Sequence, residues 1–358
     1  MSVLPHNLAL FKLIGLWRPV DWSSGWKYLC YNVYSLIVVI TIFSSVFTEI
    51  VKLISSYENL DTFLTSATVL ITMAADCVKI TNMLSKRENI LKMIQTLINN
   101  PCLPRNSEEK LIQNKYDRII RFRSLANITL IAATVLYFTI ESLFRDIPQQ
   151  KLPYNAWYPM SLSIYANYLL AWIHQNLAHI YGALITADYD TFVPAFMLQS
   201  CAKFDILSYR LSNICCKIQN NLEQPGCNNK KEFCKYTNDT FSSVILLQFS
   251  VSTGVICVTV YSLSQTAVSD PFFPMLISYL ACMLVQLFLY CYAGTEVTLK
   301  SADVAEAIYC NVDWWLTSIA VQKKLLFMML RSTKLVTYTC GKIFDLSIES
   351  YKNVNYNL

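Results

Sequence analysis

Residues 271–295 read PFFPMLISYLACMLVQLFLYCYAGT, a run without a single charged side chain. A helix rises about 1.5 Å per residue and the hydrocarbon core of a bilayer is about 30 Å thick, so roughly 20 apolar residues cross it. This run is long enough to do so. It therefore predicts a membrane-spanning helix.

Five further stretches of similar composition precede this run. Of the chain's 358 residues, 54% are hydrophobic and only 15% charged, whereas a soluble domain carries about 25% charged residues. We therefore predict an all-α membrane protein that forms one domain over residues 1–358. The expected spans are Leu29–Phe47, Thr62–Asn82, Leu125–Phe144, Ser161–Ala187, Phe241–Gln265 and Pro271–Thr295.

The second stretch is the weakest, because it contains Asp76 and Lys79. Side chains three residues apart share one face of a helix, so these two charges can neutralise each other. His174 and His179, in the fourth stretch, are five residues apart and do not share a face. We expect both histidines to lie in the interior of the bundle.

The distribution of basic residues sets the orientation. Most of the 29 Lys and Arg residues lie before the first stretch, between the second and third, between the fourth and fifth, and after the sixth. Cytoplasmic loops carry such an excess, which places the N-terminus in the cytoplasm. This orientation is the reverse of that of G-protein-coupled receptors. The net charge of +5 indicates a basic inner face and requires no nucleic-acid partner.

Shorter helices are expected on the cytoplasmic side. Lys86–Asn99 has the apolar spacing of an amphipathic helix. Lys323–Ser332 has an apolar centre too short to span a bilayer, so it should form a helix packed against its neighbours. A seventh membrane helix could begin near Leu346. The residues from there to Leu358 are too few to cross a bilayer, so we expect this last helix to be truncated.

The sequence lacks the common signatures of enzymes. Its seven Gly form no G-x-G dinucleotide fingerprint and no phosphate-binding loop, and its three His form no H-E-x-x-H zinc motif. We therefore expect neither catalysis nor a metal or cofactor. A transporter is a weaker alternative, because the two halves of the chain show no repeated pattern of interrupted helices.

Several segments resemble one known family. The chain reads LACMLVQLFLYCYAGTEVTLKSADVAEAIYCNVDWW at 280–315, KKLLFMMLRSTK at 323–334 and TYTCGKIFDLSIESYKNV at 337–354. This succession is similar to the C-terminal signature of insect odorant receptors. The segment LPYNAWYP at 152–159 agrees with it. The resemblance covers nearly the whole chain and is weakest over the first 120 residues.

The resemblance implies a bundle of about seven helices in the plasma membrane of olfactory sensory neurons. Such a subunit binds small volatile ligands and forms a ligand-gated cation channel as a heterotetramer with a shared co-receptor. The short C-terminus leaves an alternative open, a non-conducting subunit that assembles with the co-receptor and modulates it.

The family also indicates where to look for functional residues. Cytoplasmic segments of its receptors form an anchor between subunits, which would correspond here to residues 200–240 and 297–345. The ligand pocket lies in the outer half of the bundle. The expected anchor residues are Phe204, Leu207, Tyr209, Leu211, Val304, Ala305, Ile308, Tyr309, Leu326, Met329 and Leu330. The expected ligand contacts are Phe63, Val69, Met73, Leu136, Tyr137, Ile140, Ile164, Tyr165, Tyr168, Trp172 and Tyr261.

Overall fold

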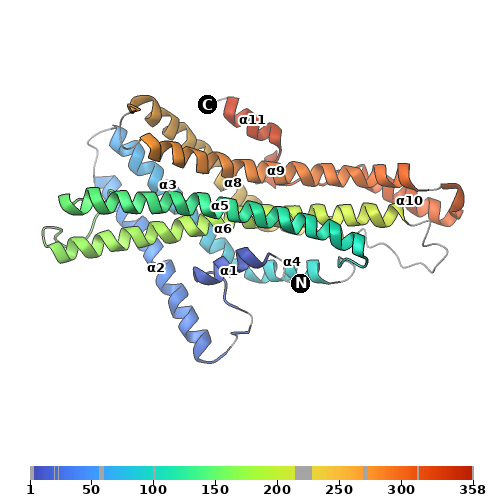
Figure 1. Ribbon diagram of the computed structural model, residues 1–358, viewed down its shortest axis with the longest axis horizontal. Coiled ribbons are helices and arrows are strands. Elements are labelled where there is room, and N and C mark those ends of the chain that lie inside the picture. The colour runs from blue at the N-terminus through green and yellow to red at the C-terminus, as the bar shows by residue number, and fades with distance from the viewer. Residues whose placement is uncertain are drawn as a thin grey trace.

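The chain forms a bundle of long α-helices in the computed structural model (Figure 1). The structure describes residues 4–19, 21–22, 24–55, 60–99, 102–213, 228–268, 273–312 and 314–356. The elements are α1 (Pro5–Leu13), α2 (Trp26–Ser55), α3 (Leu60–Ser85), α4 (Arg87–Ile98), α5 (Ser107–Gln149), α6 (Tyr165–Ser212), α8 (Asn228–Gln265), α9 (Phe273–Asn311), η1 (Trp314–Leu316), α10 (Ile319–Ser332), β1 (Thr339–Cys340), β2 (Phe344–Asp345) and α11 (Ile348–Tyr356).

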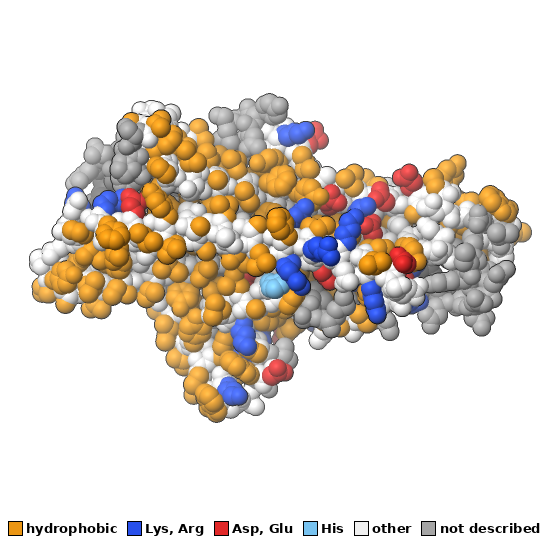
Figure 2. Space-filling model, viewed as in Figure 1, with side chains coloured by type: hydrophobic (Ala, Val, Ile, Leu, Met, Phe, Trp, Pro, Cys, Tyr) orange, Lys and Arg blue, Asp and Glu red, His pale blue; other side chains and the backbone are white. Residues whose placement is uncertain are grey.

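Five of the described helices are long and apolar enough to cross a membrane. They are α2, α5, α9, residues 63–85 of α3 and residues 232–265 of α8. Each contains all or nearly all of one of the stretches expected from the sequence; residues 271 and 272 of the sixth stretch lie outside the described residues. Figure 2 shows the matching surface: hydrophobic side chains cover most of the left half, and charged side chains gather toward the centre and right. The predicted all-α membrane fold is confirmed.

The fourth expected stretch became the central helix of the bundle. α6 contacts α2, α3, α5, α8 and α9, and all its side chains from Ala187 to Phe204 are buried. It begins at Tyr165 rather than Ser161. Its polar side chains can be tolerated there because they bond to protein groups instead of facing lipid.

The long helices continue well beyond their apolar stretches into the charged, predicted cytoplasmic region. α5 begins at Ser107 and α6 ends at Ser212, and Figure 1 shows both running side by side toward the right with α9. An ion pair of 2.7 Å between Arg210 Nη2 and Glu109 Oε2 joins the start of α5 to the end of α6. Phe204, one of the expected anchor residues, thus lies in the continuation of α6. Residues 214–227 lie outside the described residues.

The expected short helices are present as α4 and α10. Ile90, Met93 and Leu97 form the buried face of α4. These residues are spaced three and four apart, as the amphipathic pattern requires.

A two-stranded hairpin connects α10 to the last described helix. β1 and β2 pair antiparallel, and Ser242 Oγ of α8 donates a 2.8 Å hydrogen bond to the Thr339 carbonyl. The backbone of Leu346, just after β2, packs against Gly294 of α9. A Cβ added at Gly294 would lie 2.5 Å from the Leu346 carbonyl oxygen. The hairpin is therefore held between α8 and α9 at the point where α11 begins.

Candidate ligand-binding site

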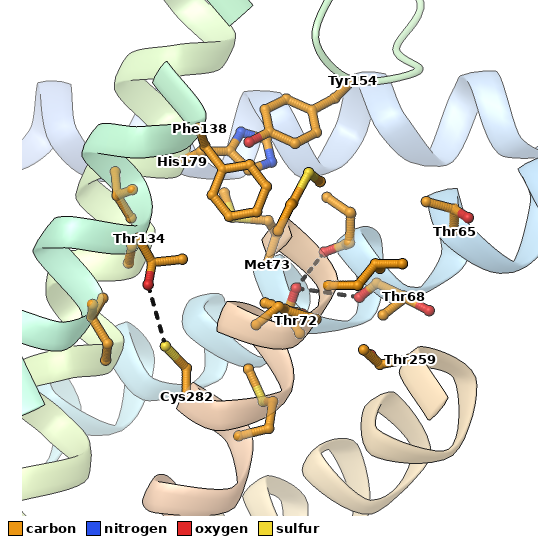
Figure 3. Close-up of a pocket in the computed structure, with 18 of the residues that line it drawn as sticks. Thr65, Thr68, Thr72, Met73, Thr134, Phe138, Tyr154, His179, Thr259 and Cys282 are labelled. Carbon is orange, nitrogen blue, oxygen red and sulfur yellow. Dashed lines mark hydrogen bonds between the residues drawn. The ribbon is translucent and has the colours of Figure 1, made fainter. Parts of the chain in front are cut away.

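A cavity of about 540 Å³ lies where α3 begins and α5 and α8 end (Figure 3). Helices α3, α5, α6, α8 and α9 form its walls, and Tyr154 from the loop between α5 and α6 covers one side. Pockets for small organic molecules usually measure about 300–1,000 Å³. This cavity therefore has the size of a small-molecule site.

Two kinds of side chain alternate around the cavity. The apolar ones belong to all five helices and include Met73, Ile131, Val135, Ile180, Val258 and Met283. Between them lie hydroxyl groups, among them those of Thr68, Thr72, Thr134, Thr139 and Thr259. A mostly apolar wall with a few polar groups suits a small, mostly apolar ligand and can fix its orientation.

A charged cluster adjoins the cavity where Asp76 and Gln286 line it. Lys79 Nζ is 3.6 Å from Asp76 Oδ1 and 3.3 Å from Asp190 Oδ1. The predicted proximity of Asp76 and Lys79 is thus confirmed. Asp190, three residues beyond the fourth apolar stretch, was not among the residues predicted from the sequence.

Hydrogen bonds complete this cluster. Thr186 donates to Asp76, Gln286 Nε2 donates to Asp190, and Tyr290 Oη donates to Asp190 Oδ1 at 3.1 Å. Asp76, Thr186 and Gln286 also line the cavity. Because buried charges require partners, the cluster ties α3, α6 and α9 together beneath the cavity.

His179 and Tyr154 form a second polar element in the wall. Their rings stack with centroids 3.6 Å apart and planes 8° apart. His179 Nδ1 donates a 2.9 Å hydrogen bond to the Gln175 carbonyl, and its Nε2 lies 3.5 Å from Glu49 Oε1. His174 Nε2 contacts Ser44 Oγ at 2.9 Å. Both histidines lie in the bundle interior, as predicted.

Three of the expected ligand contacts line this cavity: Val69, Met73 and Tyr261. The remaining eight residues do not. Phe63, Leu136, Tyr137, Ile140, Ile164 and Tyr165 are exposed on the surface of the chain.

Tyr168 and Trp172 are buried, but they bond elsewhere. Tyr168 Oη lies 3.1 and 3.0 Å from the Asp146 and Lys151 carbonyl oxygens, which share its single hydrogen. Trp172 Nε1 donates to Ser142 Oγ at 3.1 Å. Both residues hold α6 against the end of α5. The face of α6 that lines the cavity carries Asn176, His179, Ile180 and Ala183 instead.

The expected anchor residues divide into three groups by their exposure. Phe204, Leu207, Leu211, Val304 and Ile308 are buried within the chain. Their stripes therefore pack α6 and α9 inside one subunit. Tyr209, Ala305 and Met329 are partly buried, whereas Tyr309, Leu326 and Leu330 are exposed.

Comparisons with known proteins match this architecture. The 7tm odorant receptor family profile matches residues 59–356. Odorant receptor 47a of Drosophila melanogaster is 25% identical over 58% of this chain and 56% of its own length. Odorant receptor 2a of the same species is 22% identical over 99% of this chain and 93% of its own length. The chain thus spans only a little over half of the first receptor and nearly all of the second.

The fold also matches solved structures. The insect olfactory receptor OR5 of Machilis hrabei superposes with a TM-score of 0.86 and 16% identity, covering 99% of this chain and 94% of that one. A structure of the same receptor in complex with eugenol gives the same TM-score at 17% identity. The family match covers far more than half of the sequence, and the helices provide its membrane spans. This multi-pass membrane protein therefore belongs to the 7tm odorant receptor family.

Proposed function

We propose that this chain is the ligand-recognising subunit of an odorant-gated cation channel. The observation that carries the proposal is the cavity of about 540 Å³ enclosed by α3, α5, α6, α8 and α9. Its mostly apolar wall suits small volatile molecules, because burial of their apolar surface supplies the main binding free energy. The eugenol complex of the related OR5 supports a ligand of this size class.

The excess of Lys and Arg in alternate loops supports a cytoplasmic N-terminus. In that orientation the cavity opens in the outer half of the bundle, which odorants reach from outside the cell. We place the chain in the plasma membrane of olfactory sensory neurons.

The partner in this proposal is the shared odorant co-receptor, in a heterotetramer. Exposed apolar side chains at the inner ends of α9 and α10 support such a contact. Tyr309 is 69%, Leu326 55% and Leu330 64% exposed, and Trp315 in η1, between α9 and α10, is 80% exposed. A patch of this kind marks an interaction surface. These residues are our revised candidates for the anchor between subunits.

Filling the cavity tests this proposal. Val135 lines the cavity, whereas its neighbour Leu136 on α5 is exposed. We expect Val135→Trp to reduce sensitivity to activating odorants at least about tenfold, because a bulky ring removes space that the ligand needs. Leu136→Trp adds the same ring outside the cavity and should leave sensitivity unchanged.

The assay is odorant-evoked current in oocytes that express the chain with an odorant co-receptor, across a broad panel of volatiles. Surface labelling should show equal amounts of both variants. Equal sensitivity of the two variants would remove the cavity as the ligand site. Absence of current without the co-receptor is expected, and a full response without it would contradict the proposed partner.

A further inference from the structure

Most threonine hydroxyls in the cavity have already donated their hydrogens. On α3, Thr68 Oγ1 donates to the Leu64 carbonyl at 2.7 Å, and Thr72 Oγ1 donates to the Val69 carbonyl at 2.7 Å. Figure 3 shows these two side chains next to each other, in the centre of the cavity wall. Their hydrogens therefore point back to the helix rather than toward a ligand.

The same arrangement recurs on α5 and α8. Thr134 donates to Leu130 at 3.0 Å, Thr139 to Val135 at 2.9 Å and Thr259 to Val255 at 2.7 Å, in each case to the backbone carbonyl four residues earlier. Threonine side chains in helices often form this hydrogen bond to the preceding turn. It leaves these five threonine oxygens as acceptors in the cavity wall.

A hydroxyl group has one hydrogen to donate and two lone pairs to accept with. Once the hydrogen is given to a carbonyl, only acceptor capacity remains. His179 adds no donor for a ligand, because Nδ1 donates to the Gln175 carbonyl and Nε2 faces Glu49 Oε1 at 3.5 Å. The hydroxyl groups of Tyr154 and Tyr279 also line the cavity, and Tyr279 is hydrogen-bonded to Thr72, which leaves Thr72 one further lone pair for a ligand.

We propose that the preferred ligands carry a hydroxyl group, as alcohols or phenols do, and that this group donates its hydrogen to Thr68 or Thr72. Its oxygen can still accept from a tyrosine. An ether or an aldehyde can only accept hydrogen bonds, so it cannot form one with the threonine oxygens. This inference rests on the proposed function, since it assigns a ligand class to the same cavity.

Isomer pairs isolate the donated hydrogen bond from size and apolar area. The probes are 1-octanol against 1-methoxyheptane, and 2-phenylethanol against benzyl methyl ether. Binding is measured on the purified full-length chain in lipid nanodiscs, from the rise in melting temperature with ligand concentration. This readout does not depend on channel opening, so it separates ligand class from channel function.

We expect each alcohol to bind roughly threefold to tenfold more tightly than its ether isomer, the ratio that one net hydrogen bond supplies. The double variant Thr68→Val, Thr72→Val keeps the shape of the wall and removes both acceptors. It should erase this ratio while leaving ether affinity unchanged.

Thr81→Val is the matched control. Thr81 lies on the same helix and donates to the Cys77 carbonyl at 2.8 Å, but it is exposed outside the cavity. Ethers that bind as tightly as their alcohols overturn the inference, as does a double variant that weakens both members of a pair equally. The inference also fails if neither alcohol binds. If any of these outcomes occurs but odorants still evoke currents, the ligand class is wrong and the proposed function is retained.

Discussion

Replacement of Lys79 by methionine tests the charged cluster beneath the cavity. The Lys79 side chain is 2% exposed, and it lies between Asp190, at 0%, and Asp76, at 7%. Methionine keeps most of the length and volume of lysine and removes the ammonium group. The two carboxylates of α3 and α6 would then face each other without a cation.

The expected loss is about 3–5 kcal/mol of folding free energy, because removal of one partner leaves an uncompensated buried charge. Proton uptake by a carboxylate can limit this loss, so the lower end of the range is the better expectation. Adding Asp190→Asn to Lys79→Met restores the formal charge of the wild-type cluster. We therefore expect this double variant to recover more than half of the loss.

The measurement is the melting temperature of the purified chain in detergent, together with its surface expression. Lys115→Met, at an exposed lysine of α5, controls for the substitution itself. A Lys79→Met variant that melts with the wild type would refute the reasoning. So would a double variant less stable than the single one, because Lys79 would then act through packing rather than charge.

Two further predictions concern the C-terminal part of the chain. Gly294→Ala should lower surface expression and melting temperature, because its Cβ would lie 2.5 Å from the Leu346 carbonyl oxygen. Gly254→Ala, where an added Cβ would meet nothing within 4 Å, should be neutral. Equal stability of the two variants would contradict the close packing of α9 against residue 346. A membrane-impermeant maleimide should label exposed Cys310 only after permeabilisation and should spare buried Cys340, since burial raises the pKa of that thiol to about 12. Peptide mass spectrometry reads both sites, and labelling of Cys310 in intact cells would reverse the proposed orientation.

The sequence by itself determined the class of fold and the family. Long apolar runs require lipid around them, so the apolar parts of α2, α3, α5, α8 and α9 could be located from the sequence. The end of each helix that lies in its apolar run was predicted to within a few residues. The spacing of charges predicted the contact between Asp76 and Lys79, and apolar periodicity predicted α4. Each of these features depends on neighbours within one or two helical turns.

Only the tertiary structure decided which face of each helix lines the cavity. Leu136 and Val135 are adjacent apolar residues, yet one is exposed and the other lines the cavity. Lipid tails are as apolar as a protein interior, so composition cannot distinguish the two environments. The burial of α6 and the role of Asp190 could not be predicted from the sequence for a related reason. Both depend on side chains of helices far apart in the sequence, which meet only when the bundle assembles.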